Sequence, residues 1–188
     1  AKGAIDIAYK FRNKSNELKK GSFTSDFHMM SYYYENAVAA TAIAMAYGLP
    51  VEIIKNGLAN FKGLSVHMEY IGDYNGREVY IDASYLIEGI TAALDFLGDR
   101  SLVLLLDNFD TSTYRDKKET GKLMGKYANV MVATGFNEVY QRVDLEPAQE
   151  LLDAAVDSDA VKVIAGTMEE GAELAIKYSK PGDTILHL

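Results

Sequence analysis

The sequence has 188 residues, of which 48% are hydrophobic, and its formal net charge is −8. This length and apolar fraction predict one complete domain with a buried core and part of a second domain. The negative charge argues against nucleic acid or an anionic membrane as a partner, because both select a positive protein surface. Cysteine is absent and His28, His67 and His187 are scattered, so the sequence predicts no disulfide and no metal site.

The sequence shows no signal peptide and no membrane span. Residues 1–11 lack a continuous apolar core. The longest apolar run, within residues 37–49, is too short and too rich in alanine to cross a bilayer. We therefore expect a cytoplasmic protein.

The first third of the chain predicts two strands and two helices, at residues 4–11, 22–30, 35–47 and 51–61. Gly48 is expected to end the first helix, and Pro50 to start the second. Two strands cannot form a stable sheet alone, so we expect this segment to belong to a larger domain.

The rest of the chain alternates between strand and helix patterns. Asn75-Gly76 lies between two alternating runs and predicts a β-hairpin, because both turn residues need positive φ. Helices are expected at 86–97, 116–127, 146–155 and 168–179, and strands at 102–106, 129–134, 161–165 and 184–188. These patterns predict an α/β, Rossmann-like fold, in which a mostly parallel sheet follows an N-terminal β-hairpin and carries helices on both faces. Ligands of such folds bind beyond the carboxyl ends of the strands, here in the loops after Asp82, Leu106, Thr134 and Ala165.

Three stretches, residues 36–63, 80–94 and 115–128, together resemble the Mur ligase family when they are read in order. These enzymes use ATP and Mg²⁺ to activate a carboxylate as an acyl phosphate, which an amine then attacks. The resemblance implies that residues 1–63 are the C-terminal part of the family's central ATP-binding domain and residues 64–188 its C-terminal domain. The family's phosphate-binding loop, Gly-x-x-Gly-Lys-[Ser/Thr], does not occur in this sequence. We therefore expect a fragment that does not turn over ATP alone.

Asn36 is the first site residue that the resemblance suggests. The family pattern His-Asn-x-x-Asn-Ala places an asparagine against the adenine edge, which an amide can recognise because it both donates and accepts hydrogen bonds. This sequence keeps only the second asparagine and the alanine, in Asn36-Ala37. An N-cap of the first helix is the alternative interpretation of Asn36, and the two are compatible.

Asp82 and Tyr85 follow the second strand of the expected hairpin. The family motif Asp-Tyr-Ala-His faces the nucleotide and the reacting groups, and Asp82-Ala83-Ser84-Tyr85 keeps only its aspartate. The resemblance therefore implies catalytic and nucleotide-binding roles for Asp82, and nucleotide contact through the hydroxyl of Tyr85. The alternative is that Asp82 or Ser84 caps the following helix.

Arg115 is the third site that the resemblance suggests. Arg115-Asp116-Lys117 resembles a family stretch whose arginine points toward the phosphates, which a planar guanidinium can bridge. The resemblance therefore implies catalytic and nucleotide-binding roles for Arg115. The glycine-rich turn that precedes it in the family is replaced by residues 107–114, which contain no glycine. The alternative is a solvated charge cluster at the start of a helix.

We interpret the chain as part of an ATP-dependent carboxylate ligase that binds ATP and a small-molecule carboxylate. Missing signatures at substrate-facing positions suggest a divergent, archaeal-type member, similar to pseudomurein peptide ligases or coenzyme F430 synthetase. The second interpretation is a non-catalytic Rossmann-like domain that binds a ligand or a partner. A nicotinamide enzyme is a third, less favoured interpretation, because Gly-x-Gly-x-x-Gly is missing from the sequence.

Overall fold

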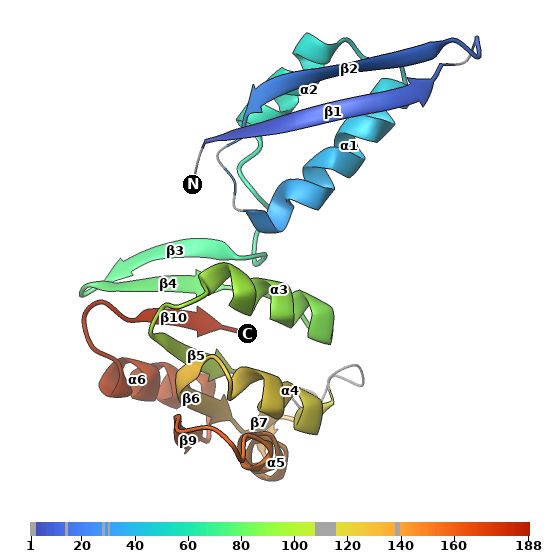
Figure 1. Cartoon of the computed structure of the whole chain (residues 1–188). Helices are drawn as coiled ribbons and strands as arrows, with labels where there is room; N and C mark the ends of the chain where they lie inside the picture. The colour runs from blue at the N-terminus through green and yellow to red at the C-terminus, as the bar shows by residue number, and fades with distance from the viewer. Residues whose placement is uncertain (1–2, 14, 28, 30, 108–115, 138–139) are drawn as a thin grey trace. The chain divides into compact units, whose positions relative to one another are not determined.

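The computed structural model describes the whole chain except residues 1–2, 14, 28, 30, 108–115 and 138–139 (Figure 1). Contacts within the chain divide it into two compact units, Ala1–Leu64 and Ser65–Leu188. Each unit has its own buried residues. The assignment of residues 1–63 and 64–188 to two domains of a ligase stays a prediction.

The first unit is a long β-hairpin packed on two helices. Its elements are β1 (Ala4–Arg12), β2 (Leu18–Asp26), the short 3₁₀ helix η1 (Ser31–Tyr33), α1 (Tyr34–Ala46) and α2 (Val51–Asn60). Alternate residues of the hairpin face the helices, and with them they form a small core of Ile5, Ile7, Phe27, Tyr33, Ala37, Met45, Ile54 and Leu58.

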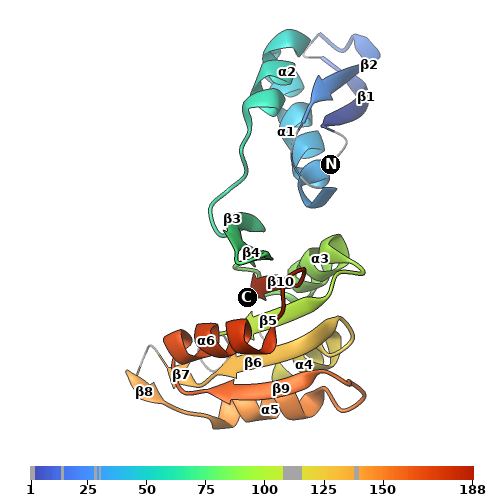
Figure 2. The same ribbon diagram turned by 90° about the vertical axis from the view of Figure 1, so that its left-hand side faces the viewer.

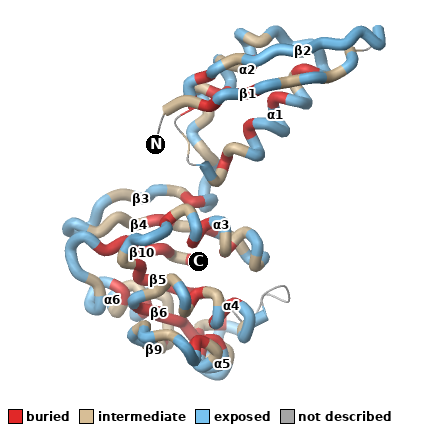
Figure 3. The backbone as a smooth tube through the Cα atoms, in the orientation of Figure 1, coloured by how far each residue is buried: buried red, intermediate tan, exposed pale blue. Residues whose placement is uncertain are grey.

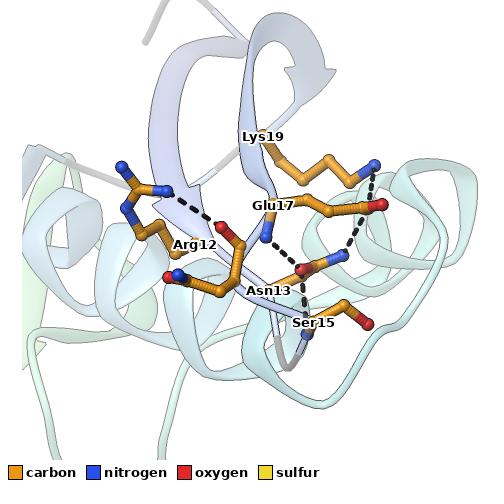
Figure 4. Close-up of polar contacts among 6 residues, drawn as sticks. Arg12, Asn13, Ser15, Glu17 and Lys19 are labelled. Carbon is orange, nitrogen blue, oxygen red and sulfur yellow. Dashed lines mark hydrogen bonds and ion pairs between the residues drawn. The ribbon is translucent and has the colours of Figure 1, made fainter.

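The second strand of this hairpin begins four residues earlier than the expected start at residue 22. It pairs with β1 antiparallel from Ala4↔Asp26 to Arg12↔Leu18. Figure 4 shows the turn that sets this register, in which the Asn13 carboxamide oxygen accepts hydrogen bonds from the backbone N–H groups of Ser15 (3.0 Å) and Glu17 (2.9 Å). This turn directly follows Arg12 and brings the polar residues after Glu17 into register with β1. These residues therefore form a strand, although their sequence lacks an apolar alternation.

The second unit contains a six-stranded sheet in the order β3-β4-β10-β5-β6-β9. Its strands are β3 (Glu69–Tyr74), β4 (Arg77–Ile81), β5 (Leu102–Leu106), β6 (Ala128–Thr134), β9 (Val161–Ala165) and β10 (Thr184–His187). Only β3 runs antiparallel to its neighbour, across a turn in which Asn75 (φ 51°) and Gly76 (φ 79°) both have positive φ. The hairpin predicted at Asn75-Gly76 is therefore confirmed.

Four helices cover the two faces of this sheet: α3 (Ile87–Leu97), α4 (Lys117–Met124), α5 (Glu146–Ala154) and α6 (Met168–Tyr178). Figure 2 shows α6 on one face and α4 and α5 on the other. The α6 face buries alternate residues of the central strands, including Val103, Leu105, Val130 and Val132. Every residue of β5 is buried, so the core follows β5 and β6 (Figure 3). This arrangement confirms the predicted α/β fold.

A short hairpin, β7 (Phe136–Asn137) and β8 (Arg142–Val143), was not expected from the sequence. It interrupts the connection from β6 to α5. Two-residue strands carry no periodicity, and only tertiary contacts such as the hydrogen bond from Asp144 N to Gly135 O (2.6 Å) define them.

We predict that Gly121→Ala will destabilise the second unit by about 3 kcal/mol in urea denaturation, because overpacking against a fixed backbone forces the elements apart. A Cβ atom on Gly121 of α4 would lie 2.1 Å from the carbonyl oxygen of Leu151 in α5. Gly57 of α2 is the matched control: a Cβ atom there meets nothing within 4 Å. Gly57→Ala should stabilise the protein by about 1 kcal/mol, since alanine has the higher helix propensity. Equal effects of the two substitutions would contradict the close packing of α4 and α5.

Candidate functional site

The carboxyl ends of the parallel strands lie along one edge of the sheet, as the fold class requires. Backbone hydrogen bonds extend the sheet just past its strands here, from Asp82 N to His187 O (2.9 Å) and from Asp107 N to Leu188 O (3.1 Å). The loops before α3, α4, α5 and α6 all begin at this edge. The N-termini of these helices therefore point toward it, which favours a bound anion.

Asp82 is a buried carboxylate, with its side chain turned into the second unit. Its exposed fraction is 1%. One carboxylate oxygen accepts a hydrogen bond from Met68 N (2.8 Å) and the other accepts one from Ser84 N (2.8 Å). Asp82 therefore joins the segment before β3 to the loop after β4.

Neither Asp82 nor Ser84 occupies the N-cap position of the next helix. The helix α3 begins at Ile87 and its N-cap is Leu86, whose side chain makes no cap hydrogen bond. By contrast, Asp116 caps α4 and accepts a hydrogen bond from Glu119 N (2.8 Å). The N-cap residue of α3 thus has no side chain that could accept from the first-turn N–H groups.

Tyr85 lies in the same loop as Asp82, one residue before the N-cap of α3. Tyr85 is 52% exposed. The structure therefore brings Asp82 and Tyr85 into one loop, with Asp82 facing inward.

Asp107 and Thr134 form a second polar contact at this edge that the sequence did not predict. Asp107 follows β5, Thr134 ends β6, and the Thr134 hydroxyl donates to the Asp107 carboxylate over 2.5 Å. Thr134 is 3% exposed, and Asp107 is half-buried. A polar residue directly after each buried strand is the signal that could have identified this pair.

The segment that leads into β3 has an unusual backbone. Val66 and Met68 have positive φ values, 53° and 47°, which are rare for residues other than glycine and unfavourable for a β-branched side chain. The Glu69 carboxylate accepts hydrogen bonds from Val66 N (2.7 Å) and from the Ser65 hydroxyl (3.0 Å). Both bonds lower the pKa of Glu69 below its ordinary value, and the bond from Val66 N has the larger effect.

Asn36 belongs to the first unit and is exposed on α1. The helix begins at Tyr34 with Tyr33 as N-cap, so the interpretation of Asn36 as an N-cap is wrong. Among the residues that the structure describes, the Asn36 carboxamide makes no hydrogen bond. It lines a cavity of about 470 Å³, together with twelve mostly apolar residues of this unit, among them Phe27, Tyr33 and Phe61.

Arg115 lies outside the described residues, so its predicted role stays a prediction. Its neighbour Asp116 is described and is the cap of α4, which places the Arg115-Asp116-Lys117 motif at the start of that helix. Outside the masked positions, no group of three or more His, Asp or Glu side chains could hold a metal ion. Within the same described part of the chain, no helix is long and apolar enough to cross a membrane.

Curated proteins similar to this chain are ligases. The sequence is 30% identical over 153 residues to the UDP-N-acetylmuramoylalanine–D-glutamate ligase of Shouchella clausii, covering 81% of this chain and 31% of that protein. The enzyme of the same name from Aquifex aeolicus is 29% identical over 152 residues, covering 80% of this chain and 34% of the relative. The chain thus spans about a third of the length of these relatives. No protein-family profile matches it.

Solved structures with the same fold include other ligases and synthases. A folylpolyglutamate synthase of Mycobacterium tuberculosis complexed with ADP aligns with a TM-score of 0.70 at 16% identity, covering 100% of this chain and 45% of that one. A pseudomurein peptide ligase type C from Methanothermus fervidus aligns with a TM-score of 0.66 at 20% identity, over 89% of this chain and 35% of that one. At these identities the likeness supports the fold alone.

We predict that Thr134→Val will destabilise the second unit by about 1–2 kcal/mol, because a half-buried carboxylate loses its hydroxyl donor while the side-chain volume stays nearly constant. The exposed pair Thr24–Asp6 on the hairpin has the same chemistry, with a hydroxyl-to-carboxylate distance of 2.6 Å. Thr24→Val is therefore the matched control and should change the unfolding free energy by less than about 0.5 kcal/mol. Urea denaturation of both variants makes the comparison, and equal changes would show that burial adds nothing to the Thr134 contact.

Proposed function

We propose, because the chain belongs to the Mur ligase family, that it is part of an ATP-dependent carboxylate ligase. Residues 1–63 are then the C-terminal part of a central ATP-binding domain, and residues 64–188 the C-terminal domain. The observation that carries this proposal is the match of four-fifths of the chain to ligases at about 30% identity. The activity belongs to a longer protein, since this sequence has no Gly-x-x-Gly-Lys-[Ser/Thr] loop.

The adenine of ATP is proposed to bind at Asn36. The surroundings of this residue suit a purine: the carboxamide has no other partner among the described side chains and backbone groups, and the adjoining cavity is apolar with aromatic walls at Tyr33 and Phe61. An amide can donate to one edge nitrogen of adenine and accept from its amino group. An apolar cavity with one such polar group is the usual form of a nucleobase site.

The phosphates and the acyl phosphate are proposed to bind at the loop Asp82–Leu86 and at Arg115. The N-terminus of α3 directly follows this loop, and its N-cap, Leu86, makes no side-chain cap hydrogen bond. A helix N-terminus of this kind favours a bound anion. The Tyr85 hydroxyl would donate to a phosphate oxygen, and the Arg115 guanidinium would bridge two of them. These groups would hold and orient the reacting atoms, and exclusion of water from them would protect an acyl phosphate from hydrolysis.

ATP supplies the phosphoryl group that makes the carboxylate reactive toward an amine. The residues described here hold the base and the phosphates, whereas no cluster of acidic side chains among them fits Mg²⁺. The Mg²⁺ ligands are therefore proposed to lie mostly elsewhere in the longer protein.

The substrate carboxylate is proposed to come from a small molecule other than the usual muramoyl peptides. Tyr85 replaces the family histidine and Asp107 begins a turn that lacks the family's glycines, so the substrate side of the site differs. An archaeal-type ligase, like a pseudomurein peptide ligase or coenzyme F430 synthetase, accounts for both departures. Turnover of a UDP-muramoyl peptide by the longer protein would contradict this assignment.

A non-catalytic binding domain is the second candidate function. The glycine-free turn at residues 107–114 favours it, because side chains there keep a ligand away from the backbone. Nucleotide binding without any acyl phosphate in the longer protein would support this candidate. Trapping the acyl phosphate with hydroxylamine, which converts it to a hydroxamate, distinguishes the two functions.

We predict that Asn36→Ala in a longer protein with an intact phosphate-binding loop will raise the KM for ATP about tenfold or more, because the adenine edge loses its hydrogen bonds. The selectivity for ATP over GTP should fall in parallel, and kcat should change less. Steady-state kinetics with both nucleotides makes the measurement.

Asn60→Ala is the matched control for this experiment. Asn60 is an exposed asparagine at the end of α2, and its side chain donates to Asn56 O (2.8 Å). Its replacement should leave the KM for ATP and the selectivity for ATP over GTP unchanged. An Asn36→Ala variant with unchanged ATP selectivity would remove the adenine contact from the proposal.

A further inference from the structure

We propose that Asp82 is a positioning residue that couples the segment Ser65–Met68 to the loop Asp82–Leu86. The segment is the first stretch of the second unit and directly follows the first unit in sequence. The loop is the one at which the phosphates are proposed to bind. The inference rests on the proposed function only for the identity of the ligand, since the coupling itself is built from contacts within the second unit.

Three hydrogen bonds form the coupling. Two of them join the segment to the loop, and one lies within the loop. Met68 N donates to one Asp82 oxygen (2.8 Å) and Ser84 N donates to the other (2.8 Å). Ala83 N donates to Val66 O (2.7 Å). Since Asp82 is 1% exposed, water does not compete effectively for these bonds. The two stretches therefore hold one another in a single arrangement.

The segment needs this support because its backbone is strained. Val66 (φ 53°) and Met68 (φ 47°) both lie in the left-handed region, and Val66 is β-branched. Such residues persist only where surrounding contacts determine their conformation. Met68 N is fixed by Asp82 from one side, and Val66 N by the Glu69 carboxylate from the other (2.7 Å). Loss of either carboxylate leaves the backbone N–H of one strained residue without its acceptor.

Asp82 therefore contributes to ligand binding through the loop rather than by direct contact. Both of its oxygens accept a backbone N–H, and Asp82 is 1% exposed, so a ligand has little access to the lone pairs that remain. A ligand that binds Tyr85 and the N-terminus of α3 instead selects the ordered loop. By linkage, the same ligand stabilises the strained segment, and the segment's conformation changes the affinity for the ligand.

The first test measures hydrogen exchange in the 188-residue chain without nucleotide. In Asp82→Ala, the amides of Met68 and Ser84 should exchange at least tenfold faster, while those of Val103 and Met131 in the central strands stay protected. Retained protection in β5 and β6 shows that the variant is folded. Unchanged exchange at Met68 in that folded variant would overturn the proposal.

Two further variants separate the coupling from general destabilisation. Asp82→Asn keeps one acceptor oxygen, so only one of the Met68 and Ser84 amides should lose protection. Glu69→Gln keeps its acceptor and should leave Met68 unchanged, although it removes the charge beside Val66. Equal loss of protection at both amides in Asp82→Asn and in Asp82→Ala would contradict the two-oxygen arrangement.

The second test uses ADP and the longer protein after hydroxamate trapping has established ligase activity. ADP should slow exchange at Met68 at least threefold in the wild type and not in Asp82→Ala, and the KM for ATP should rise in that variant. If an active ligase shows no ADP effect at Met68, the coupling is wrong and the proposed function stands. If ligase activity is missing, the proposed function fails. Hydrogen exchange in the nucleotide-free chain then still tests the contact between the segment and the loop.

Discussion

The burial of β5 between two helical layers is the constraint on which the second unit depends. All five of its residues, Leu102–Leu106, are buried, and it pairs in parallel with β10 on one side and β6 on the other. Because its neighbours must share its direction, every polar residue that follows one of these strands arrives at the same edge. Asp82, Asp107 and Thr134 gather there for this reason, although they are far apart in the sequence.

The same constraint determines how an anionic ligand can be held at that edge. The second unit carries eleven Lys and Arg residues against 22 Asp and Glu, whereas the first carries eight against five. The overall field of the second unit therefore repels a phosphate. A phosphate bound there, as we propose, would have to rely on local donors such as the N-terminus of α3, because short-range hydrogen bonds can outweigh a screened long-range repulsion.

The elements that could be predicted from the sequence are those with strong local signals. The apolar run of β5 was enough to predict a buried strand, and Asn75-Gly76 was enough to predict a hairpin turn with positive φ. Both predictions were confirmed. The position of β2 could not be predicted, because its register depends on the turn that Asn13 organises and not on its own side chains. The start of α1, by contrast, lies within one residue of the predicted start, at Tyr34.

The candidate site shows a deeper limit of inference from a motif. A motif transfers the identity of a residue and its place in the fold, and Asp82 is where the resemblance placed it, at the end of the second hairpin strand. It does not transfer the direction of the side chain, which depends on what else needs that carboxylate. Here two backbone amides, one from a segment with strained φ values, take both oxygens. A residue that matches a ligand-binding motif can therefore position a loop without contacting the ligand. Its hydrogen-bond partners distinguish direct contact from positioning.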